Sequence, residues 1–396
     1  MKMDKKHLID SVRRRYPNVK WFKGGISKYR VSKLDDMLMT AEQIEAGEAS
    51  KAEKARLVQQ YLKSGKKLAK NAKNAINWIN KVRPDIPKRS DWKDLRTDIL
   101  FCRFAYGFLT EEYLCFNLEN KSMAERQEFV SDVMRYRCVY QMNDLSDVQI
   151  FNNKGYTYEK FKKYYRRDAV YIRSKRDFEK YRAFISKHQE FVSKAVYEGM
   201  GRGISLVDIR NCEMSETEFF DDMIAHGPHI LEERVKQCSV LAALNESSVN
   251  TVRVITFNTR EGIVAPYTFM KVGRKGSFVD NGGAGGIFVG IDKDTGMFCT
   301  DGFDEAKNRY ECHPDSGLKF VGYQLPDWQQ LIQLSKKLSA MVPSVKYTGW
   351  DFTHTDKGWV VIEGNGASQM IAPQIVFERG IRAEVDELLK KMDLIV

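Results

Sequence analysis

Three oxygen-bearing side chains, Asp351, Glu363 and Asn365, stand in two apolar segments near the end of the chain. Glu363 and Asn365 are two residues apart, so on a strand they point to the same side. Carboxylates that lie close together repel each other and need a cation. Hard oxygen ligands of this kind suit Mg²⁺, which proteins usually share with substrate phosphates. The residues therefore predict a magnesium site. The alternative, a solvated hairpin edge with ordinary charges, is disfavoured by the apolar strands around them.

A hairpin is expected to bring Asp351 and Glu363 together. Residues 355–359 are typical of a three-residue loop with its glycine in the left-handed conformation. Pairing Thr355 with Trp359 sets a register in which Asp351 lies directly opposite Glu363.

A second group of residues is typical of phosphate binding. Lys194 lies inside an apolar strand, and Gly199, Gly201 and Gly203 follow it. Alternate glycines let the backbone approach a ligand and aim N–H groups at phosphate oxygens. The spacing matches neither GxxxxGK(S/T) nor GxGxxG, so taken alone a flexible hairpin turn is an equal alternative.

Arg253 lies inside the apolar segment 249–256. Buried arginine is rare unless it is paired. Its partner is either an internal carboxylate, which makes the residue structural, or an anionic substrate, which makes it catalytic. A structural Arg253 is expected to maintain stability, whereas a catalytic one is expected to face the metal site.

The composition limits the kind of protein. The 396 residues are 43% hydrophobic and 12% aromatic, enough for a packed core in two or three structural units. No apolar run is long enough to span a membrane, and none near the N-terminus is typical of a signal peptide. The seven cysteines are odd in number and lack a CxxC pair, which indicates reduced thiols in a cytoplasmic protein.

The net charge of +11 is compatible with nucleic acid, an anionic membrane surface or phosphorylated small molecules as partners. Basic runs such as 13–15 and 63–67 are short and dispersed, which is typical of solvated helix faces. We therefore expect no nucleic-acid partner. The charge is also compatible with a peripheral role at the inner face of a membrane.

The pattern of the sequence changes from helical to mixed near residue 147. Residues 1–147 are predicted to be helical, with apolar residues at helical spacing in 92–106 and 124–142. Beyond them, β-branched runs alternate with glycine-rich turns, which predicts an α+β domain with antiparallel sheets. The predicted strands there are 169–172, 191–197, 229–233, 249–256, 263–272, 286–291, 345–353 and 359–363. The predicted helices there are 158–165, 178–187, 216–225, 328–341 and 383–391.

Over about residues 148–390 the sequence resembles the ATP-grasp superfamily, and in particular the sugar-transfer-associated ATP-grasp proteins found among bacterial surface-polysaccharide genes. Short motifs spread over this range carry the resemblance. They are Asn152-Asn153-Lys154, Lys194 with its glycine loop, Leu231-Glu232-Glu233, Asn250-Thr251-Val252-Arg253, Asp280-Asn281, His313-Pro314-Asp315, Gly349-Trp350-Asp351 and Glu363-Gly364-Asn365.

The resemblance implies an ATP-grasp fold over residues 148–396, in which two α+β sub-domains with antiparallel sheets clasp ATP. The helical region 1–147 precedes it. The nucleotide-binding sub-domain would span about 148–235, and the sub-domain with the metal-binding hairpin about 236–396. ATP and Mg²⁺ are the implied cofactors.

The resemblance also assigns roles to individual residues. These are Asp351, Glu363 and Asn365 for Mg²⁺; Lys154 and Lys194 for the phosphates, under a loop of Gly199, Gly201 and Gly203; Glu232, Glu233 and Val235 for adenine and ribose; Arg253, with Lys194, for catalysis; and Asn250, Asn281 and His313 for the other substrates. Many ATP-grasp ligases carry a basic residue where this chain has Gly349, which leaves Arg253 as the main residue to stabilise an acyl phosphate. They often carry proline where it has Ala195.

The implied activity is that of an ATP-dependent carboxylate–amine ligase. A substrate carboxylate attacks the γ-phosphate of ATP, and the acyl phosphate then reacts with an amine. The family's gene context points to a sugar acid and an amino acid or amine in capsule or O-antigen synthesis. One alternative is a kinase of a sugar or glycan hydroxyl, with His313 or Asp315 as its base. Another is a non-catalytic nucleotide-binding module of a polysaccharide assembly complex.

Overall fold

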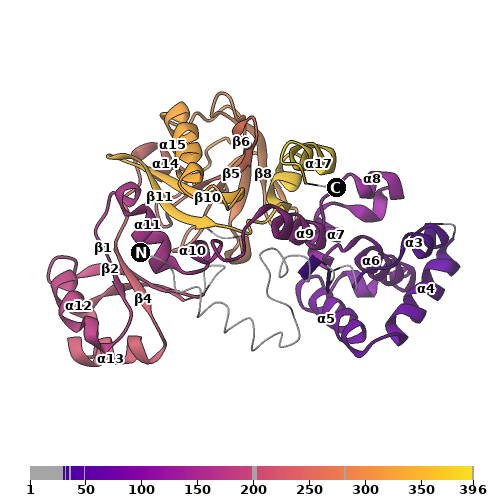
Figure 1. Cartoon of the computed structure of the whole chain (residues 1–396), viewed down its shortest axis with the longest axis horizontal. Helices are drawn as coiled ribbons and strands as arrows, with labels where there is room; N and C mark the ends of the chain where they lie inside the picture. Colours follow the sequence, from indigo (N-terminus) through magenta and orange to yellow (C-terminus); the bar gives the residue numbers. More distant parts are fainter. Residues whose placement is uncertain are drawn as a thin grey trace. The chain divides into compact units, whose positions relative to one another are not determined.

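The computed structural model describes residues 30–31, 33–34, 37–48, 50–198, 203–280 and 282–394 (Figure 1). They form two units, one drawn from Met1–Ser146 and Gln369–Val396, the other from Asp147–Ser368. The sequence places a boundary one residue later and expects the second domain to continue to residue 396. In the structure the segment after Ser368 packs within the first unit instead, where the Gln374 side chain both donates to and accepts from the backbone of Val130.

The described part of the first unit is helical. Its α-helices are α3 (Ala41–Glu48), α4 (Lys51–Lys63), α5 (Lys66–Val82), α6 (Trp92–Tyr106), α7 (Thr110–Cys115), α8 (Met123–Gln127), α9 (Asp132–Met142), α16 (Ile371–Val376) and α17 (Arg382–Lys390). The predicted helix 92–106 is confirmed as α6. The predicted helix 124–142 is wrong as one element, because Ser131 caps a new helix, α9, after α8 has ended.

The second unit contains two antiparallel sheets. The four-stranded sheet has the order β1-β4-β2-β3, and its strands are β1 (Ala169–Ile172), β2 (Glu190–Ala195), β3 (Ile204–Asp208) and β4 (His229–Glu233). The seven-stranded sheet has the order β11-β10-β5-β6-β7-β8-β9, and its strands are β5 (Thr251–Thr259), β6 (Gly262–Val272), β7 (Ile287–Ile291), β8 (Phe298–Phe303), β9 (Arg309–Tyr310), β10 (Tyr347–Thr355) and β11 (Gly358–Asn365).

Six α-helices accompany these sheets: α10 (Gln149–Asn152), α11 (Lys154–Tyr165), α12 (Phe178–Ile185), α13 (Glu216–Ala225), α14 (Ser239–Leu244) and α15 (Trp328–Ala340). Every strand predicted from the sequence is present, with ends that differ by a few residues. Strands β3, β8 and β9 were not predicted. Leu206 of β3 is exposed, β8 contains a glycine and polar residues, and β9 is two residues long, so none shows a clear alternation.

Alternation along the long strands separates the two faces of the seven-stranded sheet. Trp350 of β10, Val252 and Val254 of β5, and Met270 and Val272 of β6 belong to one apolar core. Helix α15 packs against β5 and β6 (Figure 1). The residues between these positions point to the opposite face, and several of them are polar. Among the described residues, no helix is both long and apolar enough to cross a bilayer.

Candidate functional site

The hairpin of β10 and β11 places Asp351 directly opposite Glu363, as predicted, although its loop differs from the prediction. Thr355 pairs with Gly358 and not with Trp359, so the loop is one residue shorter than expected. A β-bulge immediately after Asp351 compensates for this difference. Bulges redirect side chains and are common beside active sites.

A row of polar side chains crosses the face of the sheet opposite the core. The register aligns Glu363 on β11, Asp351 on β10 and Arg253 on β5. Lys271 on β6 lies opposite Thr251, which is two residues before Arg253 on the same face of β5. Because directly paired residues point to the same side, four neighbouring strands contribute to one surface.

Arg253 and Asp351 form a bidentate ion pair at the centre of this row. The Nε and Nη2 atoms of Arg253 donate to the two carboxylate oxygens at 2.5 and 2.7 Å. Lys271 Nζ adds a third hydrogen bond to Asp351, at 3.1 Å. Asp351 is only 2% exposed. Burial by itself would raise the pKa of its carboxyl group, but the two cations outweigh burial and hold the pKa below its usual range.

The contacts of Arg253 are compatible with both roles considered for it. Its partner is an internal carboxylate, as a structural role requires. That carboxylate, Asp351, is also the first predicted metal ligand, so Arg253 lies beside the predicted metal site as a catalytic role requires. The two roles do not exclude each other, because one ion pair links β5 to β10 and also lies beside the predicted site.

Gly349 leaves the space that Arg253 occupies. A Cβ atom at this position would lie 2.2 Å from Ser368 Oγ and 3.2 Å from Arg253 Cδ. Ser368 in turn accepts a 2.8 Å hydrogen bond from Nη1 of Arg253. The basic residue expected here in many ATP-grasp ligases would collide with this arrangement. Arg253 thus brings a positive charge from the neighbouring strand into the space beside Gly349.

Replacing Gly349 by alanine is expected to destabilise the protein by about 1–3 kcal/mol, the usual cost of forcing a methyl group into filled space. The new methyl group must displace Ser368 and disturb the Arg253–Asp351 pair. Urea unfolding measures the loss. Gly283→Ala is the matched control, because a Cβ atom at Gly283 meets nothing within 4 Å. Equal stability of the two variants would contradict the prediction.

Glu363 and Asn365 are the side chains of the row best suited to a cation. Within the described residues, the Glu363 carboxylate has no hydrogen-bond or ion-pair partner. Asn365 Nδ2 is buried and likewise lacks a partner there. A half-turn of the amide exchanges nitrogen and oxygen, so this position offers a donor to a phosphate or an oxygen to a metal.

The donor set thus fits Mg²⁺ with two carboxylates and one amide. In the described ranges, no three His, Cys, Asp or Glu side chains cluster as metal ligands. Convergence of Asp351, Glu363 and Asn365 on one ion stays a prediction. Opposite register brings the first two together, and Asn365 follows on the same face.

The predicted phosphate-binding lysines have their contacts in and beside the four-stranded sheet. Lys194 on β2 donates to Glu232 on β4 at 2.9 Å, and Arg167 donates to the same carboxylate. Burial would raise the pKa of Glu232, but the two cations outweigh burial and lower it. Burial lowers the pKa of Lys154, and the charges of Glu363 and Lys194 act on it in opposite directions. Glu363 and Lys194 therefore both contribute to the electrostatic environment of Lys154.

The glycine loop is described only at its ends. Gly199 and Gly201 lie outside the described residues, as does Asn281. Gly203 has a φ of 66°, which favours glycine, and its carbonyl accepts from Ala195 N at 2.7 Å as β2 and β3 meet. At the other end, Lys154 Nζ donates to the carbonyl of Glu198. Lys154 thus reaches the residue at which the predicted phosphate loop begins.

The predicted adenine segment is tied to its neighbours through both of its glutamates. Glu232 is the shared acceptor of Lys194 and Arg167, and Glu233 accepts a hydrogen bond from the backbone of Asp168 at 3.0 Å. These contacts position the end of β4. Contacts of Glu232, Glu233 and Val235 with a nucleotide stay predictions.

Asn250 and His313 are both fully buried and hold the segment after β6 in place. Asn250 Oδ1 accepts from Gly273 N, and its amide group donates to the carbonyls of Leu241 and Asn245. His313 Nε2 lies 3.0 Å from the carbonyl of Gly273. These contacts are structural, and the predicted substrate contacts of both residues stay predictions.

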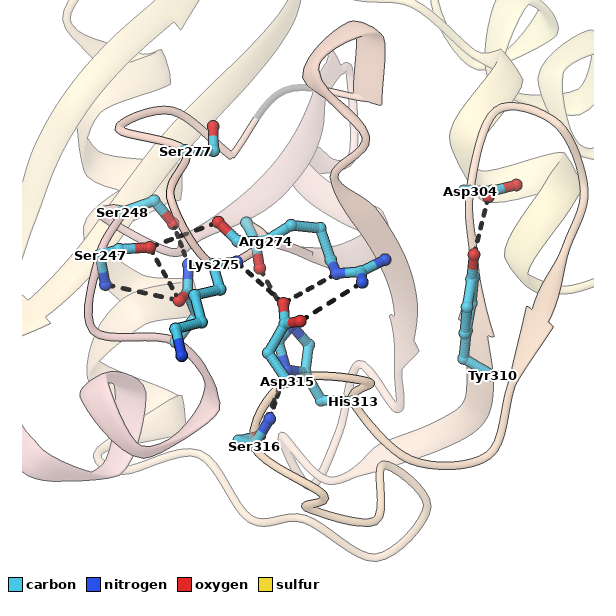
Figure 2. Close-up of polar contacts among 12 residues, drawn as sticks. Ser247, Ser248, Arg274, Lys275, Ser277, Asp304, Tyr310, His313, Asp315 and Ser316 are labelled. Carbon is cyan, nitrogen blue, oxygen red and sulfur yellow. Dashed lines mark hydrogen bonds and ion pairs between the residues drawn. The ribbon is translucent and has the colours of Figure 1, made fainter.

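Asp315 holds the same segment after β6, as Figure 2 shows. We call the contacts of His313 and Asp315 with residues 273–275 the clamp. Arg274 Nε and the backbone N–H of Lys275 each donate to Asp315 at 2.8 Å. The hydrogen bond from Arg274 is the main reason why the pKa of Asp315 falls to about 2. Ser316 N–H donates to His313 Nδ1, so the other ring nitrogen carries the proton toward Gly273. Both groups are committed to holding the loop.

Of two further charged residues of the site, Lys271 was missed from the sequence, and Asp280 was noted as part of a motif but given no role. Lys271 is 8% exposed and pairs with Asp351. Asp280 accepts from Thr251 Oγ1 at 2.5 Å, lies 3.9 Å from Lys271 Nζ, and has its pKa raised by burial. Lys271 stands inside an apolar strand, the same signal that singled out Lys194. The same criterion, a lysine inside an apolar strand, identifies Lys271 as well when it is applied to every strand.

The family model described as "Sugar-transfer associated ATP-grasp" matches residues 133–390. No curated protein matches the chain.

Solved structures of other proteins are similar to part of this chain. The ATP-grasp ligase PsnB with its minimal precursor is 12% identical, with a TM-score of 0.40 over 65% of this chain and 69% of its own. The D-alanine–D-alanine ligase from Coxiella burnetii is 13% identical, with a TM-score of 0.36 over 63% of this chain and 59% of its own. The RiPP-associated ATP-grasp ligase from Chryseobacterium gregarium is 14% identical, with a TM-score of 0.38 over 63% of each chain.

The assignment rests on the family model, whose match includes all the motifs from Asn152 to Asn365 and covers well over half of the sequence. The α+β architecture with antiparallel sheets is that of the ATP-grasp fold. The chain therefore belongs to the sugar-transfer-associated ATP-grasp family.

Proposed function

We propose that this protein is an ATP-dependent carboxylate–amine ligase that joins an amino acid or amine to a sugar acid in surface-polysaccharide synthesis. The main support is the row of Glu363, Asp351 and Arg253 across three paired strands. It places Glu363, which has no ion-pair partner among the described residues, beside the pair of Asp351 and Arg253. The sugar-transfer family supplies the polysaccharide context.

In this proposal the chain acts by positioning and by charge. Lys154 and Lys194 bind the phosphates of ATP, and Mg²⁺ held by Glu363, Asn365 and Asp351 would neutralise charge on them. The substrate carboxylate attacks the γ-phosphorus, the bond to ADP breaks, and an acyl phosphate forms. Arg253 stabilises the charge that develops on the transferred group. The amine then attacks the acyl carbon, and phosphate leaves.

The contacts of His313 and Asp315 favour a ligase over a kinase. A kinase needs a base that takes the proton of the attacking hydroxyl. Both residues considered for that role are engaged in the clamp around Gly273 and Arg274. A ligase needs no such base for its first step, because a carboxylate is already ionised.

The decisive experiment measures ADP release with a panel of sugar acids, each with and without amino acids, and determines product masses. An amide formed together with ADP and phosphate supports the ligase. A phosphorylated sugar would assign the protein as a kinase instead. Nucleotide binding without any product from the panel would favour the non-catalytic module.

Replacing Lys194 by alanine is expected to weaken ATP binding by about 1.5–3 kcal/mol, the scale of a hydrogen bond to a charged group. The fold should persist, because Arg167 still neutralises Glu232. Calorimetric titration with Mg·ATP measures the change. Lys160→Ala, at an exposed position of α11, serves as the control. Unchanged affinity in the Lys194 variant would remove this residue from the site.

A further inference from the structure

The positive charge of the chain is concentrated in one segment. Residues 51–90 contain 12 Lys or Arg and 2 Asp or Glu, whereas the rest of the chain contains 52 and 51. Ten of the eleven net positive charges therefore come from forty residues. The basic residues form short, separate runs in the sequence. The interpretation of the charge as dispersed was wrong, because it considered these runs singly and not the forty-residue segment that contains them.

Helix α5 gathers these charges on one side. Lys70, Lys73 and Lys81 are exposed and follow one another at helical intervals, with the exposed Asn77 between them. We call these three lysines the lysine stripe. It runs for about 16 Å along the helix, at 1.5 Å per residue. The opposite side of α5 is buried through Ala72, Ala75 and Ile79, so the fold holds the stripe outward.

The lysine stripe is not neutralised within the described part of the chain. Helix α5 contains no Asp or Glu, and none of the three lysines has a carboxylate partner among the described residues. Lys63 and Lys88, exposed near the two ends of α5, are also unpaired there.

Other cations of the same segment are paired. They are Lys51 with Asp94, Lys54 with Asp98, Arg56 with Glu53, Arg83 with Asp85, and Arg89 with Asp91 and Glu119. Like charges three and four residues apart destabilise a helix. Within the stripe, Lys70 and Lys73 have this spacing, so their repulsion destabilises the free helix and an anionic partner would relieve it.

The chemistry of the stripe favours a lipid surface over a nucleic acid. The five cations of the segment that lack a carboxylate partner among the described residues are all lysines. Lysine acts as a point charge, whereas arginine is preferred for shaped recognition of phosphates and bases. Beside Lys81, Trp78 is half-buried and Val82 is 46% exposed. A tryptophan and an aliphatic residue flanking lysines suit the boundary between headgroups and acyl chains.

We propose that α5 binds an anionic bilayer surface through Lys70, Lys73 and Lys81. Each lysine held near the surface strengthens binding, and the attraction falls with added salt. This inference is independent of the proposed ligase activity, since it needs no substrate and involves no residue of the predicted site.

The test is vesicle flotation of the full chain, with phosphatidylcholine alone or mixed in equal parts with phosphatidylglycerol. We expect binding to the mixed vesicles only, weakened by added salt. The triple variant Lys70→Gln, Lys73→Gln, Lys81→Gln should bind them about a hundredfold more weakly. Glutamine forms helices about as well as lysine, so the variant should fold, and its melting curve checks this.

Two matched variants test whether the position and the charge are responsible. Lys160→Gln, Lys187→Gln, Lys336→Gln removes three exposed lysines from the other unit and should bind like the parent. The Lys→Arg triple variant at positions 70, 73 and 81 keeps the charge and should also bind. The proposal is overturned if the variant at positions 160, 187 and 336 loses as much vesicle binding as the glutamine variant of the stripe. It is also overturned if the Lys→Arg variant loses binding, or if the parent protein does not bind the mixed vesicles. Tighter binding to a DNA duplex at equal ionic strength would also overturn it.

Discussion

Replacing Glu363 by glutamine is expected to lower ATP turnover by about a thousandfold, a loss of about 4 kcal/mol of transition-state stabilisation. Glutamine keeps the shape of the side chain but removes the charge that would hold Mg²⁺. The fold should persist, because Glu363 has no ion-pair partner among the described residues. ADP release measures turnover, and calorimetry with and without Mg²⁺ measures nucleotide binding. The variant should lose most of the Mg²⁺-dependent part of that binding.

Glu213→Gln, at an exposed position of the same unit, is the control for removal of one negative charge. Full turnover by the Glu363 variant would refute the predicted metal site. In a complex with Mg²⁺, the oxygens of Asp351, Glu363 and Asn365 should lie about 2.0–2.1 Å from the ion. A crystal structure with Mg·ADP measures these distances directly.

Replacing Arg253 by lysine is expected to lower kcat by about a hundredfold and stability by about 1–3 kcal/mol. Arg253 contacts both oxygens of Asp351 and also Ser368. A lysine keeps the charge, but its single ammonium group cannot reproduce this fork. Lys271 still contacts Asp351, so the carboxylate is not left unpaired and the fold should survive. ATP affinity should change little, because the nucleotide contacts are assigned to other residues.

The two effects of this substitution are separated by kcat per folded molecule and by urea unfolding. Arg274→Lys is the matched control, because Arg274 pairs with Asp315 in an exposed contact of the clamp. That variant should keep nearly full stability, since exposed ion pairs contribute little. A less stable Arg253 variant with normal turnover per folded molecule would leave Arg253 a structural role only.

Much of the site was predictable from short stretches of sequence. Short apolar runs located β10 and β11, and the glycine before Trp359 marked their turn. Once the hairpin was assumed, the opposition of Asp351 and Glu363 followed. The loop was misjudged by one residue and a bulge restored the register, so the prediction was correct although its geometry was not. Local patterns succeed here because the two strands are adjacent in the chain.

The partners across distant strands were decided only by the tertiary structure. Strand β5 lies beside β10, although Arg253 and Asp351 are 98 residues apart. The sequence around either residue gives no indication of the other as its partner. The same holds for Lys271, and for Ser368, whose hydroxyl meets Arg253 above Gly349. The sequence could show only that an arginine inside an apolar strand needed an internal carboxylate or an anionic substrate as its partner.

The sequence by itself thus determined the fold family, most of the strands and helices, and the types of residue available for chemistry. Those properties depend on periodicity, turn residues and motifs, which act over a few positions. The tertiary structure decided that one carboxylate, Asp351, serves both Arg253 and Lys271, and that the segment after Ser368 packs with the first unit. It also decided that the lysines of α5 form one outward stripe. Each of these depends on which surfaces are buried together, and burial is a property of the whole chain.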